Sequence, residues 1–137
     1  MKIAIMGAGG LGGFFGGKLA QAGHDVWFIA RGQQLAALKT SGLRLQGPDP
    51  EIVISHPNAT EMPAEIGAVD LVLFCVKLYD VEPAAALIKP ILTDATAVIS
   101  VLNGIDGPQR LAAALETGTV FSGAARISAK IKAPGVI

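Results

Sequence analysis

The sequence has little cysteine, no excess of charge of either sign and no long apolar run, and each shortage excludes a class of protein. A single cysteine, Cys75, cannot form an internal disulfide, so nothing indicates an oxidising compartment. Lys and Arg together number 11, as do Asp and Glu, so no basic field attracts nucleic acid. No segment approaches the roughly 20 apolar residues of a membrane span. We therefore expect a cytoplasmic protein that binds neither nucleic acid nor a membrane.

Apolar residues are abundant, at 51% against 16% charged, which is typical of a folded chain and excludes a disordered one. The length of 137 residues suits one ordinary domain. Cys75 lies in an apolar run at residues 69–76 and is interpreted as a buried structural thiol. The cysteine and the histidines show no metal-ligand spacing, so we expect no metal site.

Short apolar strands alternate with helical segments along the chain. The clearest unit joins a strand at residues 2–6, a helix at 10–22 and a strand at 26–29. Further helices are expected at residues 33–41, from Asp80 as N-cap to about residue 92 with Pro90 closing or kinking its end, and from Gly107-Pro108 onward. Further strands are expected at 69–76, 97–102, 120–121 and 127–131, with a small hairpin pairing 43–45 and 52–54. This alternation predicts an α/β fold, a doubly wound and mostly parallel sheet with helices on both faces.

A glycine-rich loop joins the first strand to the first helix and matches the pattern G-x-G-x-x-G. Its residues are Gly7, Ala8, Gly9, Gly10, Leu11 and Gly12. Gly7 permits a tight turn, Gly9 lets a pyrophosphate approach the backbone, and Gly12 lets the helix lie close to the strand. Amides at the helix start would then hold the phosphates. The order strand, loop, helix predicts a Rossmann-type dinucleotide-binding domain.

The glycines of the predicted helix are costly unless they serve a purpose. Glycine inside a helix costs about 0.8–1 kcal/mol relative to alanine, so Gly12, Gly13, Gly16 and Gly17 together cost roughly 3–4 kcal/mol. Close approach of the backbone to the sheet and to a ligand explains at least Gly12 and Gly16. The alternative is a glycine-rich helix whose small residues serve packing alone.

The end of the second strand indicates which dinucleotide binds. NAD-binding folds usually place a carboxylate there, which bonds the adenosine ribose 2′-hydroxyl and repels a 2′-phosphate. This sequence has Ala30 and Arg31 there instead. A guanidinium pairs with phosphate through two hydrogen bonds. We therefore predict NADP(H), the alternative being that Arg31 is a solvated surface residue.

Several further runs resemble the ketopantoate reductase (2-dehydropantoate 2-reductase) family, and the resemblance covers essentially the whole chain. The runs are residues 1–12, Gly23-His24-Asp25-Val26, Ala30-Arg31, Phe74-Cys75-Val76-Lys77, Leu102-Asn103-Gly104-Ile105 and Pro134-Gly135-Val136-Ile137. The glycine loop is shared with many dehydrogenases, whereas Val76-Lys77 combined with Asn103-Gly104 is more specific. The resemblance implies NADPH-dependent reduction of ketopantoate to pantoate, a step towards pantothenate and coenzyme A.

The resemblance also implies roles for two residues at carboxyl ends of strands. Lys77 and Asn103 would contact the cofactor and the 2-oxo acid substrate, at the edge where α/β sheets form their ligand crevice. Without the resemblance, Lys77 would be a solvated residue after a buried strand. Asn103-Gly104 would likewise be an ordinary turn.

The family has a second, helical domain that this chain lacks. By resemblance, that domain supplies a lysine as general acid and a glutamate that binds the substrate hydroxyls, so no catalytic residue is expected within residues 1–137. The run at 134–137 is typical of a turn followed by the start of a strand, and we expect the cofactor-binding domain to be truncated near this end. We expect the chain alone to be inactive, and a homodimer to form through the missing domain.

Two other functions stay open from the sequence. A related NAD(P)-dependent dehydrogenase of another 2-oxo or 3-hydroxy acid fits, because substrate choice lies largely in the missing domain. A non-catalytic module that binds NADP also fits. A downstream helical segment carrying lysine and glutamate would favour the enzyme over the module.

Overall fold

The structure, a computed structural model, describes residues 1–102, 106–116 and 118–137. Its strands and α-helices are β1 (Lys2–Met6), α1 (Gly10–Gln21), β2 (Asp25–Ile29), α2 (Gly32–Ser41), β3 (Leu43–Leu45), β4 (Ile52–Ile54), β5 (Asn58–Thr60), β6 (Leu71–Phe74), α3 (Val81–Ile88), β7 (Ala97–Ser100), α4 (Gly107–Leu115) and β8 (Thr119–Ser122). Short 3-10 turns are η1 (Pro63–Glu65), η2 (Leu78–Asp80) and η3 (Lys89–Ile91). Within these residues no helix is long and apolar enough to cross a bilayer.

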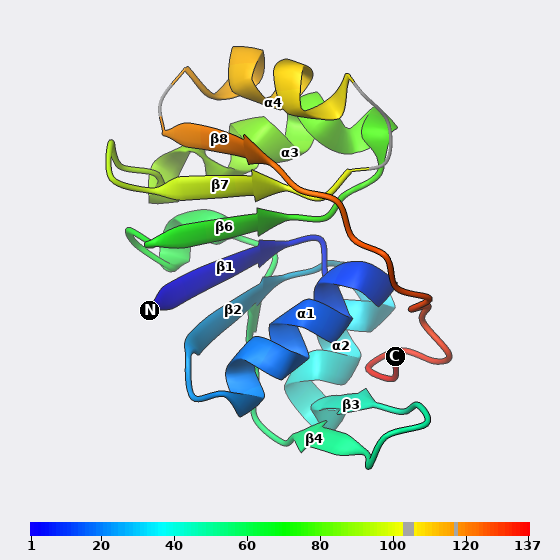
Figure 1. The fold of residues 1–137 in the computed structure, drawn as a ribbon. Coiled ribbons are helices and arrows are strands. Elements are labelled where there is room, and N and C mark those ends of the chain that lie inside the picture. The colour runs from blue at the N-terminus through cyan, green and yellow to red at the C-terminus, as the bar shows by residue number, and fades with distance from the viewer. Residues whose placement is uncertain (103–105, 117) are drawn as a thin grey trace.

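Six strands of the described chain form one parallel sheet in the order β5-β2-β1-β6-β7-β8 (Figure 1). β1 pairs with β2 on one side and with β6 on the other. The chain thus builds the sheet outward from β1 twice, first towards β5 and then towards β8. The doubly wound parallel sheet predicted from the sequence is confirmed, and β3 and β4 form the predicted antiparallel hairpin.

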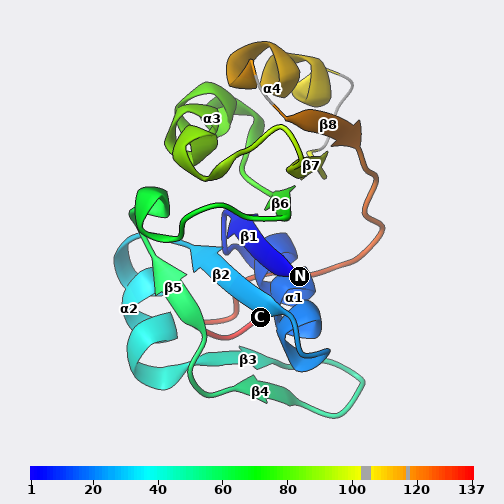
Figure 2. The same ribbon diagram turned by 90° about the vertical axis from the view of Figure 1, so that its left-hand side faces the viewer.

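Helices cover both faces of the sheet, as the sequence predicts. α1 and α2 lie with the β3–β4 hairpin around one core, which includes Ile5, Phe28 and Leu38. α3 and α4 enclose a second core, which includes Phe74 and Leu111. Figure 2 shows α1 on one side of the sheet and α3 and α4 on the other.

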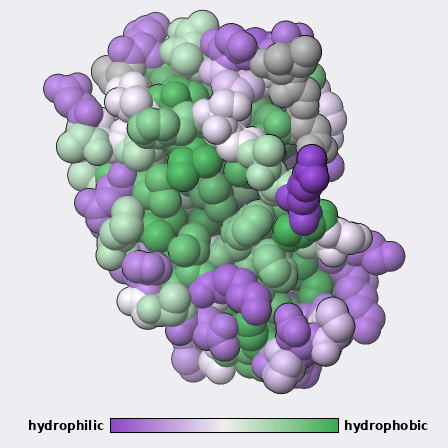
Figure 3. Space-filling view, in the orientation of Figure 1, coloured by the Kyte–Doolittle hydropathy of each residue, from purple (hydrophilic) through white to green (hydrophobic). Residues whose placement is uncertain are grey.

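The α1 side of the sheet is only half covered by helices of the described residues. Leu73, Ile99 and Phe121 stand in one row across β6, β7 and β8. Burial falls along this row, from buried Leu73 to Phe121, which is 51% exposed. Figure 3 shows the resulting apolar surface in the middle of this face. α1 therefore shields the half of the sheet built on β1 and β2.

One predicted strand is absent, and one observed strand was not predicted. Residues 127–131 form no strand but cross the carboxyl ends of the sheet strands, where Ala129 packs against Gly10. Ile127 and Ile131 are exposed, so the apolar alternation of this run does not mark a buried face. β5 was not predicted, because a strand of three largely polar residues shows no apolar run. These residues form a strand only because they pair with β2.

The third helix begins at its predicted position, directly after Asp80, and Pro90 lies at its C-terminal end as predicted. α3 ends at Ile88 rather than near residue 92, because Pro90 lacks the N–H that would continue the helix. Asp80 precedes α3, yet its side chain makes no capping hydrogen bond. The expected cap is therefore absent at this residue, and its carboxylate has another partner, described below.

The glycines of α1 let the helix lie directly on the sheet. A Cβ at Gly12 would collide with a backbone carbonyl oxygen of the glycine loop, and one at Gly16 with the ring of Phe28. Gly13 and Gly17 are closed off in the same way, by side chains of the C-terminal segment and of the hairpin. Close packing therefore accounts for all four glycines that helix propensity disfavours.

Gly16→Ala tests this packing. The Phe28 ring is fully buried and cannot move away, so we expect the added methyl to lower the free energy of unfolding by about 1–3 kcal/mol. Urea denaturation followed by circular dichroism measures the change. Gly47→Ala is the matched control, because a Cβ there meets no atom within 4 Å. Equal losses in the two variants would contradict the packing argument.

Candidate functional site

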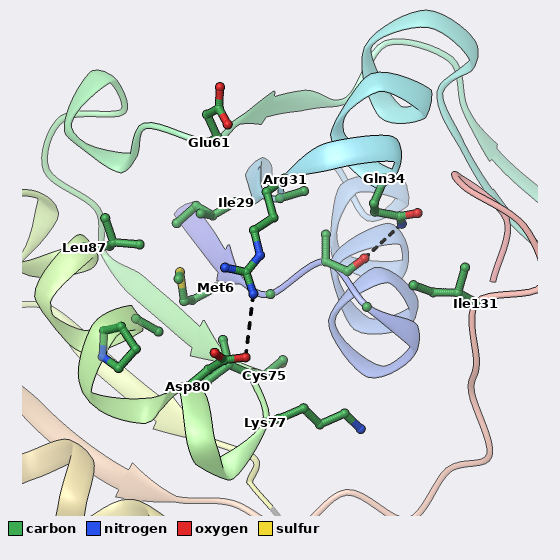
Figure 4. A pocket seen from close by; sticks show the side chains of 17 residues that line it. Met6, Ile29, Arg31, Gln34, Glu61, Cys75, Lys77, Asp80, Leu87 and Ile131 are labelled. Atoms are coloured by element: carbon green, nitrogen blue, oxygen red, sulfur yellow. Dashed lines mark hydrogen bonds and ion pairs between the residues drawn. The ribbon is translucent and has the colours of Figure 1, made fainter.

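A cavity of about 360 Å³ opens at the carboxyl ends of β1, β2 and β6. Parallel α/β sheets bind ligands at this edge, next to the strand from which the chain winds in both directions. The wall is formed by the glycine loop, the ends of β2 and β6, α3 and the C-terminal segment (Figure 4). The labelled lining residues are Met6, Ile29, Arg31, Gln34, Glu61, Cys75, Lys77, Asp80, Leu87 and Ile131.

The glycine loop is fixed on its sheet side and open on its cavity side. Gly7 turns the chain out of β1 with a φ of 97°, a conformation that other residues rarely adopt. The N–H groups of Gly7 and Ala8 both donate to the Ile29 carbonyl oxygen, at 3.3 Å. Gly9 follows in an extended conformation, and a Cβ there would meet no atom within 4 Å. The loop therefore forms a cradle that fits a pyrophosphate lying against the backbone.

The N-terminus of α1 adds an electrostatic reason for an anion to bind here. No side chain of the described residues caps this end, and no acidic residue occupies the first turn. Backbone N–H groups of a helix start and the helix dipole both favour a negative charge. The end of α1 beside Gly9 is thus suited to phosphate.

The structure brings several of the predicted site residues together and leaves others apart. The cavity wall includes Gly7, Ala8, Gly9, Arg31 and Lys77. The first turn of α1, beside the wall, holds Gly10, Leu11 and Gly12. Asn103 lies outside the described residues. Cofactor or substrate binding by any of these residues stays a prediction.

Gln34, which the sequence analysis did not single out, holds the glycine loop from α2. Its Nε2 donates to the Ala8 carbonyl oxygen at 2.9 Å, and its Oε1 accepts from the N–H of Gly135 at 2.9 Å. One amide therefore connects the loop, α2 and the C-terminal turn. The partners lie 26 and 101 residues away, so no local pattern in the sequence indicates this role.

Arg31 reaches over the cavity from the end of β2 towards Asp80 (Figure 4). Its Nη2 lies 3.8 Å from Oδ2 of Asp80, and the Arg31 side chain is 84% exposed. An exposed ion pair of this kind contributes only about 0–1 kcal/mol, so the guanidinium stays available to another anion. Glu61 adds a second carboxylate to the wall and Lys77 a second cation.

Cys75 lies directly after β6 and also lines the cavity. Burial raises the pKa of the Cys75 thiol to about 12, because an apolar surrounding disfavours the charged thiolate. The thiol is therefore neutral at physiological pH. Cys75 is half-buried at the cavity wall rather than fully buried, and its structural role stays a prediction.

A parallel sheet in this strand order, with a glycine loop between β1 and α1 and a cavity at the strand ends, defines a Rossmann-type domain. This is the fold class that binds dinucleotides at that edge. The chain belongs to the ketopantoate reductase PanE/ApbA family, whose model matches residues 3–137.

Individual relatives support the same assignment. A 2-dehydropantoate 2-reductase of Mesorhizobium japonicum is 41% identical over 106 residues, which cover 77% of this chain and 32% of that protein. The crystal structure of a PanE/ApbA family ketopantoate reductase from Ralstonia eutropha JMP134 is similar with a TM-score of 0.93 at 38% identity, covering 99% of this chain and 45% of that one. A D-mandelate dehydrogenase solved with NADH and anilino(oxo)acetate reaches 0.88 at 28% identity, covering 99% and 44%. The chain thus spans less than half the length of these relatives.

Gly9→Ala is expected to separate cofactor binding from folding. Alanine fits the extended backbone without a collision and costs at most about 1 kcal/mol at this N-cap position. Its methyl group would stand where a pyrophosphate approaches, so NADPH and NADH should both bind at least about tenfold more weakly. Fluorescence titration measures both affinities. Unchanged affinity in a folded variant would show that the loop does not hold the pyrophosphate.

Cys75 is expected to resist alkylation in the native protein. With a pKa of about 12, about one thiol in ten thousand is ionised at pH 8, and the thiolate is the reactive form. Iodoacetamide should therefore label the native chain far more slowly than the chain in urea, and labelling should speed up as pH rises towards 12. A native rate equal to that of free cysteine would contradict this.

Proposed function

We propose that this chain is the cofactor-binding part of an NADPH-dependent 2-dehydropantoate 2-reductase. One observation carries the proposal: the glycine cradle and Arg31 line the same cavity, and no carboxylate follows β2 where an NAD-binding fold usually has one. Membership of the ketopantoate reductase family supplies the reaction class, reduction of a 2-oxo acid. The sequence-based expectation of a cytoplasmic location stays a prediction.

The residues that line the cavity fit both phosphate groups of NADP(H), the pyrophosphate and the 2′-phosphate. The open backbone at Gly9 and the uncapped start of α1 would hold the pyrophosphate. Arg31, exposed at the end of β2, would pair with a 2′-phosphate on the adenosine ribose. When bound, the reduced nicotinamide supplies the hydride.

Lys77 is the residue of the described chain best placed to meet the substrate. It follows β6 at the carboxyl edge of the sheet, is exposed, and lines the cavity. An ammonium group there would attract the carboxylate of a 2-oxo acid and orient its keto carbon. Family resemblance implies that Asn103 shares this role. The proton for the developing alkoxide and the contacts of a homodimer are proposed to come from residues beyond 137, so this chain alone is expected to be inactive.

A dehydrogenase of another 2-oxo acid is the second candidate. The observation in its favour is the likeness to D-mandelate dehydrogenase, a relative solved with NADH and an oxo acid. The two candidate functions differ in substrate, and they also differ in cofactor if the second one uses NADH.

NADPH oxidation by the intact gene product, followed at the nicotinamide absorbance, tests the proposal. We expect consumption of NADPH with 2-dehydropantoate, and slower consumption of NADH. Arg31→Asp should weaken NADPH binding more than about tenfold and NADH binding less than about threefold, because only NADPH carries the 2′-phosphate. Equal weakening of both would remove the NADP assignment. NADPH binding without turnover of 2-dehydropantoate would remove the substrate assignment.

A further inference from the structure

Asp80 stands at the start of α3 without capping it. Aspartate is a preferred N-cap residue, yet this side chain makes no hydrogen bond to the first N–H groups of the helix. The side chain is 31% exposed and lines the cavity. A carboxylate that is not used by its own helix is free to act across the cavity.

The group opposite Asp80 is the guanidinium of Arg31. The two side chains come from different elements, η2 after β6 and the turn after β2, and they point towards each other over the cavity (Figure 4). Within the described residues this is the ion pair that Arg31 makes, at 3.8 Å. Glu61 lines the same cavity but makes no ion pair with Arg31 among the described contacts.

We propose that Asp80 is the internal counter-ion of Arg31 and thereby sets how strongly the site prefers a 2′-phosphate over a 2′-hydroxyl. The proposal rests on the proposed NADP(H) function. A phosphate that pairs with Arg31 must either displace Asp80 or share the guanidinium with it. Displacement loses the existing attraction, and sharing places two anions side by side. Both lower the affinity for a phosphate, and neither acts on a neutral hydroxyl.

Asp80 is therefore a positioning residue that acts through Arg31. Among the described residues, no hydrogen bond or ion pair joins its side chain to the glycine loop, so we expect the contacts common to NADPH and NADH not to depend on it. Its charge should change the ratio of the two affinities rather than their common strength.

Asp80→Asn tests this by removing the charge while keeping the shape of the side chain. In the intact gene product we expect NADPH to bind about three- to fivefold more tightly, with NADH affinity changed by less than about twofold. NADPH affinity should also become more sensitive to salt, because an attraction no longer neutralised inside the protein is screened by ions. In an Arg31→Gln background, the gain from Asp80→Asn should fall below about twofold.

Two controls remove the same charge from neighbouring positions. Glu82→Gln acts on α3 itself, where the carboxylate pairs with Arg110 at 2.7 Å outside the cavity. Glu61→Gln removes a carboxylate of the cavity wall that does not pair with Arg31. Each should change the affinity ratio by less than about twofold.

The results for the Asp80 variants test the role of Asp80, and the affinities of the wild-type protein test the proposed cofactor. Unchanged or weaker NADPH binding in folded Asp80→Asn, and also in Asp80→Ser, would overturn the counter-ion role. An equal gain in Glu82→Gln would also overturn it, because net charge would then be the cause. A wild-type protein that binds NADH more tightly than NADPH would contradict the proposed cofactor. In that case, a shift towards NADPH in Asp80→Asn would still support the role of Asp80.

Discussion

The rest of the structure depends on one steric constraint, the absence of side chains from the face of α1 that packs on the strands beneath it. Gly12 and Gly16 have no space for a Cβ, so any larger residue would push the helix away from β1 and β2. Because the helix lies so close, the chain has only residues 7–9 in which to leave β1 and enter α1. So short a connection fixes the backbone amides at the sheet edge and leaves the cavity in front of them. The conformational cost of the glycines is a consequence of this geometry.

The cavity combines a rigid part with a labile part. The glycine loop is held by the Ile29 carbonyl on one side and by Gln34 on the other, so its shape is set before any ligand arrives. Arg31 is different, since it is largely exposed and held by one long ion pair to Asp80. In the proposed function the rigid part meets the pyrophosphate, which all nicotinamide dinucleotides share. The labile part would meet the 2′-phosphate, the group by which NADP differs from NAD.

The sequence predicted most of the fold because the signals that matter are local. The order strand, glycine loop, helix, strand is written in adjacent residues, and so is the alternation that winds the sheet. It did not reveal β5, a short polar strand that exists only because β2 offers it an edge. It also did not reveal Gln34 or the partner of Asp80, because both depend on contacts between elements far apart in the chain. At Asp80 the local preference gave a wrong prediction, because a residue type favoured as an N-cap pairs with Arg31 instead.

If this chain uses NADP(H), as proposed, its backbone does not decide the cofactor. A ketopantoate reductase and a D-mandelate dehydrogenase solved with NADH match this chain with TM-scores of 0.93 and 0.88, so closely similar backbones occur in both enzymes. In the proposed function the glycine loop holds the pyrophosphate, which the two dinucleotides have in common. Discrimination would then come from side-chain charges beside the adenosine ribose. Among the described residues, the ion pair between Arg31 and Asp80 on the cavity wall is the proposed source. A balance between one arginine and one carboxylate would make cofactor preference a property of single residues, which can change while the fold stays constant.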